Sequence, residues 1–506
     1  MAAPILRWGD IGSEPTNFQT AEPTKNDSPA QDDLRPTQYN DDALAQRFTV
    51  QHGDDLRYTA AWGKWSMWAG TRWRHDDTLH VFDLARAVCR QASAECDDDK
   101  HFALRFASAQ TVSAVERLAR ADRRHAATLE QWDADPWLLN TPGGIVDLRT
   151  GALRPSRRED YQTKSTAVAP GNGCATWLSF LARITAGDVE LQGFMQRMAG
   201  YALTGVTREH ALFFLYGTGA NGKSVFVNTI CGTLGDYART APIETFIDSR
   251  NQNHPTDLAG LQGARLVTAV ETEDGRCWAE SKLKALTGGD RIAARYMRQD
   301  FFEFSPVFKL VIAGNHKPGL RTVDEAMRRR FNLLPFAVTI PPTERDSELT
   351  EKLRAEWPGI LAWAIAGCLA WQREGLNPPL AVAGATAAYL EAEDALARWF
   401  DDRTERKPGA WESATALFRD WQFWASANGE SVGSQKRFSE NLTARGFSPN
   451  RKNTGRGFEG IALLTGTVTD GDGSVGYPRH ARARNGDNDT TRHNPSPQRG
   501  DSRLLQ

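Results

Sequence analysis

The chain has 506 residues, 40% of them hydrophobic, which is enough for sizeable cores in about three domains of about 150 residues each. The formal net charge of −2 excludes a strongly basic or acidic protein as a whole, so any nucleic-acid surface must be argued locally. The six cysteines form no C-x-x-C pair, which argues against a zinc site or disulfide framework and favours free thiols in a reducing cytosol. No apolar run approaches about 18 residues and the N-terminus is polar, so we expect a cytoplasmic chain with no membrane partner.

Shifts in composition and periodicity divide the chain into segments. Both ends are polar and lack periodicity, and the parts between them carry helical or strand patterns. The expected segments are a disordered N-terminus at 1–41, an α+β domain at 42–175, an α/β core at 176–345, a helical connector at 346–393, a small mixed unit at 394–465 and a disordered tail at 466–506.

The first globular segment contains a tryptophan-dense stretch at 62–73. Tryptophans alternate on both sides of a glycine turn, which predicts a β-hairpin. Such side chains can stack on nucleic-acid bases, but clustered tryptophans more often pack in a core, and we expect packing here. Helical periodicity follows over 80–131, and two turn signals within 139–151 predict a second hairpin.

The strongest single signal is the octapeptide GTGANGKS at 217–224. A helical stretch at 176–206 precedes it, and the apolar run at 211–216 predicts a buried parallel strand leading into it. The octapeptide fits G-x-x-x-x-G-K-[ST], in which glycines let several backbone N–H groups point into one concavity. Lys223 can reach the β/γ-phosphates of a nucleoside triphosphate, and the Ser224 hydroxyl can bind Mg²⁺. The residues expected to bind the triphosphate are Gly217, Thr218, Gly219, Ala220, Asn221, Gly222, Lys223, Ser224 and Val225.

Two further apolar strands end in polar groups suited to triphosphate hydrolysis. Strand 265–271 ends in Glu271, with Glu273 just beyond, so a carboxylate here can hold the metal or polarise the attacking water. A threonine separates the two acids, which leaves open which of them has which role; a surface acid is the alternative. Strand 309–315 ends in Asn315, whose amide can bond the γ-phosphate or the water, with a strand-end turn asparagine as the alternative. We expect all three strands to belong to one parallel sheet.

Clustered arginines provide the next signals. Arg328, Arg329 and Arg330 are consecutive and cannot all lie on one helix face. They form either a solvated basic helix end or an arginine finger that reaches a neighbouring subunit's site, which requires a ring or filament. The stretch 284–304 predicts a turn, a strand, a tip and a returning aromatic strand. Such a basic hairpin is either simply exposed or contacts a single strand in a ring pore. Its candidate DNA-binding residues are Arg291, Arg295 and Arg298.

The unit at 394–465 carries its own basic segment. Residues 436–456 contain six basic side chains and one acid. A helix followed by a basic, Gly-containing hairpin suits contact with a duplex backbone, although a charged solvated face has the same pattern. The candidate DNA-binding residues are Lys436, Arg437, Arg451 and Lys452.

Taken in order, these motifs resemble those of superfamily 3 helicases, in particular the helicase portion of phage and plasmid primases and the poxvirus-type primase–helicases. The likeness covers about 42–465. The segments that carry it are 45–48, 52–58, 137–155, 217–224, 265–273, 286–304, 309–318, 324–336, 434–438 and 445–447.

The resemblance implies a hexameric ring of AAA+-like modules that hydrolyses ATP with Mg²⁺ and translocates on single-stranded DNA. The implied fold class is α/β: an AAA+-like P-loop NTPase core with an α+β N-terminal domain and a C-terminal winged-helix-like unit. The implied roles are phosphate and metal binding for Lys223 and Ser224, the acidic motif for Glu271 and Glu273 with Glu271 at the metal, the sensor for Asn315, and the finger for Arg329 or Arg330. The family has an aromatic residue before its two arginines, where this chain has Arg328.

These inferences predict an ATP-dependent DNA helicase of a phage or mobile element, acting in replication in the cytoplasm of a bacterial host. The alternative is a DNA-dependent ATPase that loads or remodels replication partners without processive unwinding. A P-loop kinase fits less well, because the arginine and hairpin motifs have no place in it. The expected partners are single-stranded DNA, replication-fork DNA and further copies in a homo-hexamer. Only about forty residues precede the first globular segment, so we expect priming by a separate primase.

Overall fold

The computed structural model describes most of the chain between residues 40 and 476. The described residues are 40–96, 100–248, 256–271, 276–298, 300–320, 323–430, 432–453, 455–464, 468–469 and 475–476, with Glu271, Ala444, 468–469 and 475–476 described by their backbone alone. They fall into two compact units, of which the first ends at Leu390. The segments expected to be disordered lie almost entirely outside the described residues. Across the described part of the chain, no helix is both long and apolar enough to cross a bilayer.

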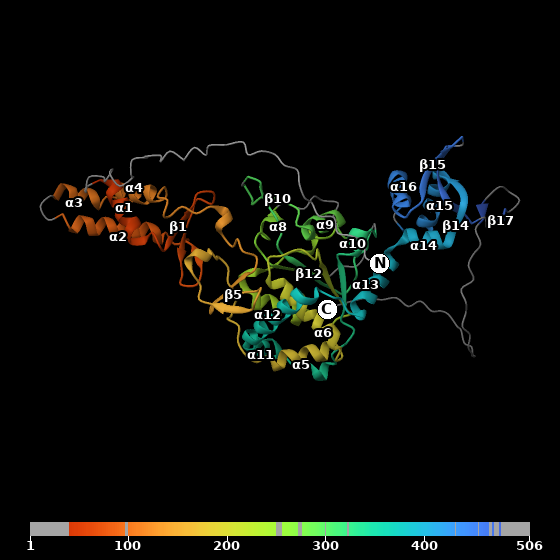
Figure 1. The fold of residues 1–506 in the computed structure, drawn as a ribbon, viewed down its shortest axis with the longest axis horizontal. Helices are drawn as coiled ribbons and strands as arrows, with labels where there is room; N and C mark the ends of the chain where they lie inside the picture. Colours follow the sequence, from red (N-terminus) through yellow and green to blue (C-terminus); the bar gives the residue numbers. More distant parts are fainter. Residues whose placement is uncertain are drawn as a thin grey trace, which may run out of the picture. The chain divides into compact units, whose positions relative to one another are not determined.

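Helices and a small antiparallel sheet form the N-terminal part of the first unit (Figure 1). Its elements are α1 (Asp41–His52), β1 (Leu56–Thr59), β2 (Lys64–Trp68), β3 (Trp73–His75), α2 (His80–Ala94), α3 (Lys100–Phe106) and α4 (Ala109–Ala119). Phe48, Val81 and Val115 are fully buried where α1, α2 and α4 pack together. Strands β2 and β3 pair antiparallel on either side of Gly70, so the predicted tryptophan hairpin is confirmed.

The tryptophans of this hairpin serve mainly as packing. Trp65 is 7% exposed and Trp73 is 1% exposed. The Trp65 Nε1 atom donates to Glu116 Oε1 at 2.5 Å, so its polar end is satisfied inside the fold. Packing is therefore confirmed for Trp65 and Trp73, whereas Trp62 is 38% exposed.

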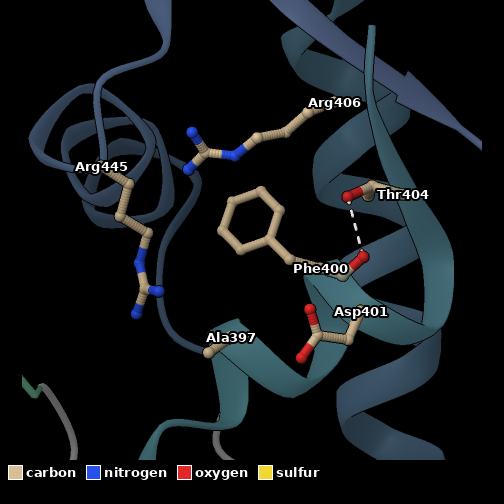
Figure 2. A pocket seen from close by; sticks show the side chains of 6 residues that line it. All are labelled: Ala397, Phe400, Asp401, Thr404, Arg406 and Arg445. Atoms are coloured by element: carbon tan, nitrogen blue, oxygen red, sulfur yellow. Dashed lines mark hydrogen bonds between the residues drawn. The ribbon is translucent and has the colours of Figure 1, made fainter.

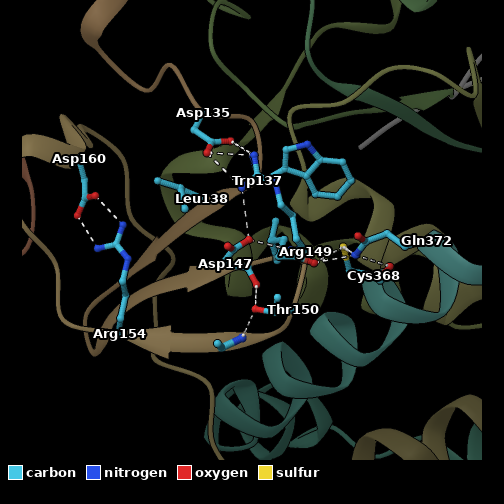
Figure 3. Close-up of polar contacts among 12 residues, drawn as sticks. Asp135, Trp137, Leu138, Asp147, Arg149, Thr150, Arg154, Asp160, Cys368 and Gln372 are labelled. Carbon is cyan, nitrogen blue, oxygen red and sulfur yellow. Dashed lines mark hydrogen bonds and ion pairs between the residues drawn. The ribbon is translucent and has the colours of Figure 1, made fainter.

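A second small sheet joins this region to the core. It consists of β4 (Leu138–Thr141), β5 (Gly144–Asp147) and β6 (Ala152–Arg154), which confirms the hairpin predicted within 139–151. Figure 3 shows Arg149 at its turn, paired with Asp135 at 3.0 Å and Asp147 at 3.5 Å. Gln372 of α12 (Trp357–Glu374) donates to Leu148 O at 2.7 Å, which ties the sheet to a core helix.

The centre of the first unit is a five-stranded parallel sheet in the order β13-β7-β12-β9-β8. Side chains of β7 alternate between two hydrophobic clusters, Phe213 and Leu215 in one, Leu212 and Phe214 in the other, so helices cover both faces. The predicted parallel α/β core is confirmed. Its elements are α5 (Ala175–Ile184), α6 (Val189–Leu203), β7 (Leu212–Tyr216), α7 (Lys223–Leu234), β8 (Ala238–Thr240), α8 (Thr256–Ala259), β9 (Leu266–Glu271), α9 (Glu280–Gly288), β10 (Ile292–Ala294), β11 (Phe302–Phe304), β12 (Lys309–Gly314), α10 (Glu325–Arg328), β13 (Phe331–Pro335), α11 (Leu349–Ala355) and α13 (Leu380–Glu393).

Strands β10 and β11 form the predicted antiparallel hairpin, separate from the main sheet. The stretch begins with the end of helix α9, over residues 284–288, and the expected turn is confined to Gly289 before β10. Lys284 pairs with Asp324 and Leu286 is fully buried, so packing holds these residues helical until Gly289, with φ 81°, ends the helix.

Helix α13 covers the edge strand β13. The Leu333 N–H donates to Thr386 Oγ1 at 2.9 Å, and the Tyr389 ring lies 5.3 Å from that of Phe331. An uncovered edge strand presents backbone groups that can pair with another chain. The helix therefore closes this edge of the sheet.

The second unit has the element order of a winged helix. Its elements are α14 (Ala395–Arg403), β14 (Thr404–Ser413), α15 (Ala414–Ala427), α16 (Gln435–Ala444), β15 (Ser448–Lys452) and β16 (Gly455–Leu463), with the short strands β17 (Val468–Thr469) and β18 (Val475–Gly476) beyond. Trp399, Leu417 and Leu442 are fully buried between the helices and the antiparallel sheet β14-β16-β15. We call the β15–β16 hairpin the wing.

Candidate nucleotide-binding site

The register of the parallel sheet brings the predicted site residues to one edge. Gly314, at the end of β12, pairs with Tyr216 of β7 on one side and with Glu271 of β9 on the other. The glycine-rich loop and Asn315 directly follow two of these positions, so they emerge together at the carboxyl ends of the strands. Parallel α/β sheets bind their ligands at such edges.

Backbone packing shapes the loop between β7 and α7. A Cβ atom on Gly217 would lie 2.3 Å from Phe336 O, and one on Gly222 would lie 2.6 Å from Ile184 Cγ2. Gly222 also has φ 85°, in the left-handed region that favours glycine. Ala220 has φ 48°, which is uncommon for a residue with a side chain. The fold itself thus requires the first and last glycines of the motif.

A cavity of about 480 Å³ opens over this loop. Its volume lies in the usual range for small-molecule sites. It takes in the predicted triphosphate-binding residues from position 219 to 225 and brings them to Asn315, whereas Gly217 and Thr218 do not line it. The lining residues are Gly219, Ala220, Asn221, Gly222, Lys223, Ser224, Val225, Val270, Ala313, Gly314 and Asn315.

Lys223 lies at the centre of a hydrogen-bond network in this cavity. Its Nζ atom donates to Gly217 O at 2.5 Å, to Asn221 Oδ1 at 3.2 Å and to Asn315 Oδ1 at 3.1 Å. The residue is 6% exposed, and burial lowers the pKa of its ammonium group. All three acceptors are neutral, and among the described side chains no carboxylate pairs with this cation. A buried cation without a counter-charge, facing a cavity, is suited to an anionic ligand.

The N-terminus of helix α7 also favours an anion in this cavity. Lys223 is its first residue and Ser224 its second, so both lie where unpaired N–H groups and the helix dipole favour negative charge. Ser224 is exposed to the cavity. A hydroxyl together with a carboxylate at the end of β9 would supply oxygen ligands of the kind Mg²⁺ takes. The backbone of Glu271 is in place for this, while its side chain and all of Glu273 lie outside the described residues.

The consecutive arginines have different surroundings. Arg330 is 7% exposed; its Nε donates to Thr287 Oγ1 at 3.1 Å and its Nη1 to Ala326 O at 2.8 Å. Arg328 and Arg329 are exposed at the end of α10. These bonds hold Arg330 within the fold, whereas the Arg329 side chain is exposed.

The predicted DNA-binding arginines of the first unit lie on or beside the β10–β11 hairpin. Arg291 and Arg298 are exposed, and the guanidinium of Arg295 lies 4.8 Å from the ring centroid of Phe301. Arg298 has φ 61°, in the turn at the tip. None of the three lines the nucleotide cavity.

The predicted DNA-binding residues of the second unit are all exposed, on α16 and the wing: Lys436, Arg437, Arg451 and Lys452. Arg451 lies directly opposite Arg456 across the wing. Like charges at opposed positions destabilise a hairpin, and a polyanion bound there would relieve the repulsion.

Sequence reasoning gave no separate role to two buried cations, Arg265 and Lys309. They lie at the amino ends of β9 and β12, 4% and 1% exposed. Arg265 donates to Leu203 O at 2.7 Å and to Leu138 O at 2.8 Å; Lys309 donates to Thr204 Oγ1 at 3.1 Å. The only signal in the sequence was their placement as a charge directly before, or at the first position of, an apolar strand.

The sheet and its loop define a P-loop NTPase-like protein. Residues 43–186 match the family described as D5 N terminal like, and residues 215–330 match a family of unknown function, DUF5906. The chain is 26% identical over 236 residues to the candidate helicase L207/L206 of Acanthamoeba polyphaga mimivirus, which covers 45% of this chain and 24% of that protein. It is 28% identical over 296 residues to the candidate helicase 022R of Frog virus 3 (isolate Goorha), covering 54% of this chain and 30% of that protein.

The chain thus spans less than a third of the length of these curated relatives. The chain is thus similar to the D5 N terminal like family over 43–186, and to viral proteins described as candidate helicases over about half of its length. A remote likeness, at 12% identity and a TM-score of 0.47, relates it to the apo structure of the NrS-1 C terminal region, over 84% of this chain and 99% of that one.

Proposed function

We propose that this chain is an ATP-dependent DNA helicase of superfamily 3 that translocates on single-stranded DNA as a homo-hexameric ring during replication of a phage or mobile element, in the host cytoplasm. The observation that carries the proposal is the position of Lys223. It is buried, lacks a described counter-charge, and contacts both the glycine-rich loop and Asn315 of the neighbouring strand.

In this proposal, the residues around the cavity bind and orient the nucleotide. Lys223 would release its bonds to Asn221 and Asn315 and hold the β/γ-phosphates. Ser224 and a carboxylate at the end of β9, Glu271 or Glu273, would hold Mg²⁺, which supplies charge neutralisation when bound. Asn315, once released, would be free to orient the attacking water.

A neighbouring subunit would complete the site. The exposed Arg329 would stabilise charge on the transferred phosphoryl group, while Arg330 supports α10 from within through Thr287. The β10–β11 hairpins of the ring would contact the translocating strand through Arg291, Arg295 and Arg298. A separate primase would supply primers.

Substitution of Lys223 tests the proposal. The Lys223→Ala protein should lose DNA-stimulated ATP hydrolysis and fork unwinding, and unwinding at the wild-type rate would contradict it. Mixing Lys223→Ala with Arg329→Ala should restore part of the ATPase activity, because one mixed interface then contains both an intact loop and an intact finger. Arg330→Ala is the matched control: it should lower stability but leave its folded protein active, so mixing it with Lys223→Ala should add no ATPase activity.

The second candidate is a DNA-dependent ATPase that loads or remodels replication partners. The basic side chains of α16 and the wing favour it, because they suit contact with the phosphate backbone of a duplex. A fork-unwinding assay separates the two candidates. ATP turnover stimulated by duplex DNA without strand displacement would establish the loader.

A further inference from the structure

A second cavity lies in the winged-helix unit, apart from α16 and the wing. Its volume is about 550 Å³. The lining residues come from α14, from the start of β14 and from the turn after α16: Ala397, Phe400, Asp401, Thr404, Arg406 and Arg445 (Figure 2). We call it the arginine–phenylalanine cavity.

Two guanidinium groups flank an aromatic surface in this cavity. Phe400 stacks on Phe447, with ring centroids 5.2 Å apart and an interplanar angle of 22°. The Arg406 guanidinium lies 5.0 Å from the Phe447 ring, and that of Arg445 lies 5.6 Å from the Phe400 ring. In Figure 2 the Arg406 side chain lies above the Phe400 ring and the Arg445 side chain lies to its left. Aromatic faces beside guanidinium groups are the elements with which proteins bind single nucleotides of a strand.

The two arginines are not equivalent in charge. Arg445 pairs with Asp394, which is 5% exposed, so this guanidinium is held in place and neutralised. Arg406 is exposed, and among the described residues no carboxylate pairs with it. In the view of Figure 2, Asp401 lies across the ring from Arg406. The cavity therefore has a cationic end and, across the aromatic ring, an end with hydrogen-bond acceptors.

We infer that the arginine–phenylalanine cavity binds one nucleotide of single-stranded DNA. Its phosphate would lie at Arg406 and its base against Phe400, with an exocyclic amine toward Asp401. A phosphodiester carries one negative charge, which one unneutralised guanidinium matches. An acidic peptide would bring several carboxylates to that single cation and would be repelled by Asp401.

The distance between the cavity and the end of the wing indicates which kind of DNA the unit would bind; this step rests on the proposed DNA-binding function. Arg406 of β14 lies opposite Ile461 of β16 in the sheet register, and Gly455 at the other end of β16 marks the end of the wing. Six positions along a strand correspond to roughly 20 Å, or about six base-pair rises. With a duplex on the wing, the cavity would be within reach of an unpaired strand, so the unit would recognise a junction between duplex and single strand.

The test compares two DNA probes on the full chain. Fluorescence anisotropy at fixed salt measures the Kd of a blunt duplex and of the same duplex with a ten-nucleotide tail at either end. Arg406→Ala should weaken binding of one tailed probe by roughly tenfold, the lower end of what a hydrogen bond to a charged group contributes, and leave blunt-duplex binding within about twofold. Lys407→Ala is the matched control, because this adjacent exposed cation is 3.5 Å from Glu405 and does not line the cavity; we expect no selective loss.

A second variant tests the aromatic surface. Phe400→Leu preserves an apolar core side chain and should reduce tailed-probe binding selectively, by about fivefold. Competition by deoxynucleoside monophosphate distinguishes a strand from a free nucleotide: displacement of the tail only at millimolar concentration supports a strand site, and micromolar displacement overturns it in favour of a nucleotide site. Equal losses on both probes, or no loss on either, also overturn the inference. If the wild-type chain binds neither probe, the result contradicts the proposed DNA-binding function itself, whereas the losses described above concern the cavity alone.

Discussion

The two ends of the same parallel sheet each contain a buried lysine, and the surroundings of the two differ. At the amino end, Lys309 lies at the C-terminus of α6, where the helix dipole is negative, and donates to the backbone of Thr204 and to its hydroxyl. At the carboxyl end, Lys223 begins α7, where the dipole is positive, and borders a cavity. Lys309 is enclosed by its own fold, whereas Lys223 faces a cavity at a helix N-terminus, a setting suited to an anionic ligand.

Burial of a cation is therefore not by itself a sign of function. Arg265 shows the same lesson at the amino end, since it joins the end of α6 to β4 through Leu203 O and Leu138 O and lies 4.5 Å from the Tyr237 ring. What marks Lys223 is the combination of a cavity, a helix N-terminus and neutral partners that can be exchanged.

The sharpest test makes the same substitution at both ends. Lys223→Met should reduce ATP turnover by about a thousandfold and leave Tm within a few degrees, because it removes a ligand contact and a buried charge. Lys309→Met should lower Tm and leave turnover per folded molecule unchanged. Phosphate release and thermal unfolding measure the two effects, and a loss of both properties in either variant would break the comparison.

Arg265→Ala should cost about 3 kcal/mol in the free energy of unfolding. The substitution leaves two buried carbonyl oxygens without a donor, each at about 1–3 kcal/mol, and removes a ring contact. Urea unfolding followed by tryptophan fluorescence measures the change. Arg239→Ala is a suitable control because Arg239 is exposed on β8 and donates only to its neighbour Ala238 among the described residues; an equal loss there would contradict a clamping role for Arg265.

Asn315→Ala should reduce turnover by roughly thirtyfold, or about 2 kcal/mol, with little change in nucleotide affinity. The amide shares the Lys223 ammonium in the resting site, and we expect its main effect at the hydrolytic step. Titration with a fluorescent ATP analogue separates affinity from turnover. Weakened nucleotide binding with normal turnover would instead show that Asn315 contributes to ground-state binding of the nucleotide.

The smallest expected effect is on pH dependence. Burial, with Arg265 nearby, lowers the pKa of Lys309 well below its ordinary value. Between that lowered pKa and the unfolded value near 10.5, the unfolded chain binds more protons, so the free energy of unfolding rises with pH. Urea titrations from pH 7 to 10 measure this free energy of unfolding. It should rise more steeply with pH for the wild-type protein than for Lys309→Met, by up to about 1.4 kcal/mol per pH unit. Parallel curves would show that Lys309 does not titrate in this window.

Sequence patterns were sufficient for the sheet and its loop, because buried strands and G-x-x-x-x-G-K-S are local signals. They did not show that residues 284–288 are helical, since packing of Leu286 and the pair between Lys284 and Asp324 decide this at long range. They left Arg329 and Arg330 equivalent, and only burial against Thr287 separates them. The arginine–phenylalanine cavity was also beyond sequence reasoning, because Arg445 lies about forty positions beyond the other lining residues, which fall within 397–406.

The cover that α13 places on β13 has a practical consequence for dividing the protein. The Thr386 hydroxyl accepts a hydrogen bond from the backbone of the edge strand β13. Tyr389 packs against the same strand just before the first unit ends. A fragment cut in the loop after α12 would expose a long apolar rim with free peptide groups and would be prone to self-association. Expression fragments of the first unit should therefore run through residue 393, and those of the second unit should begin no earlier than Asp394.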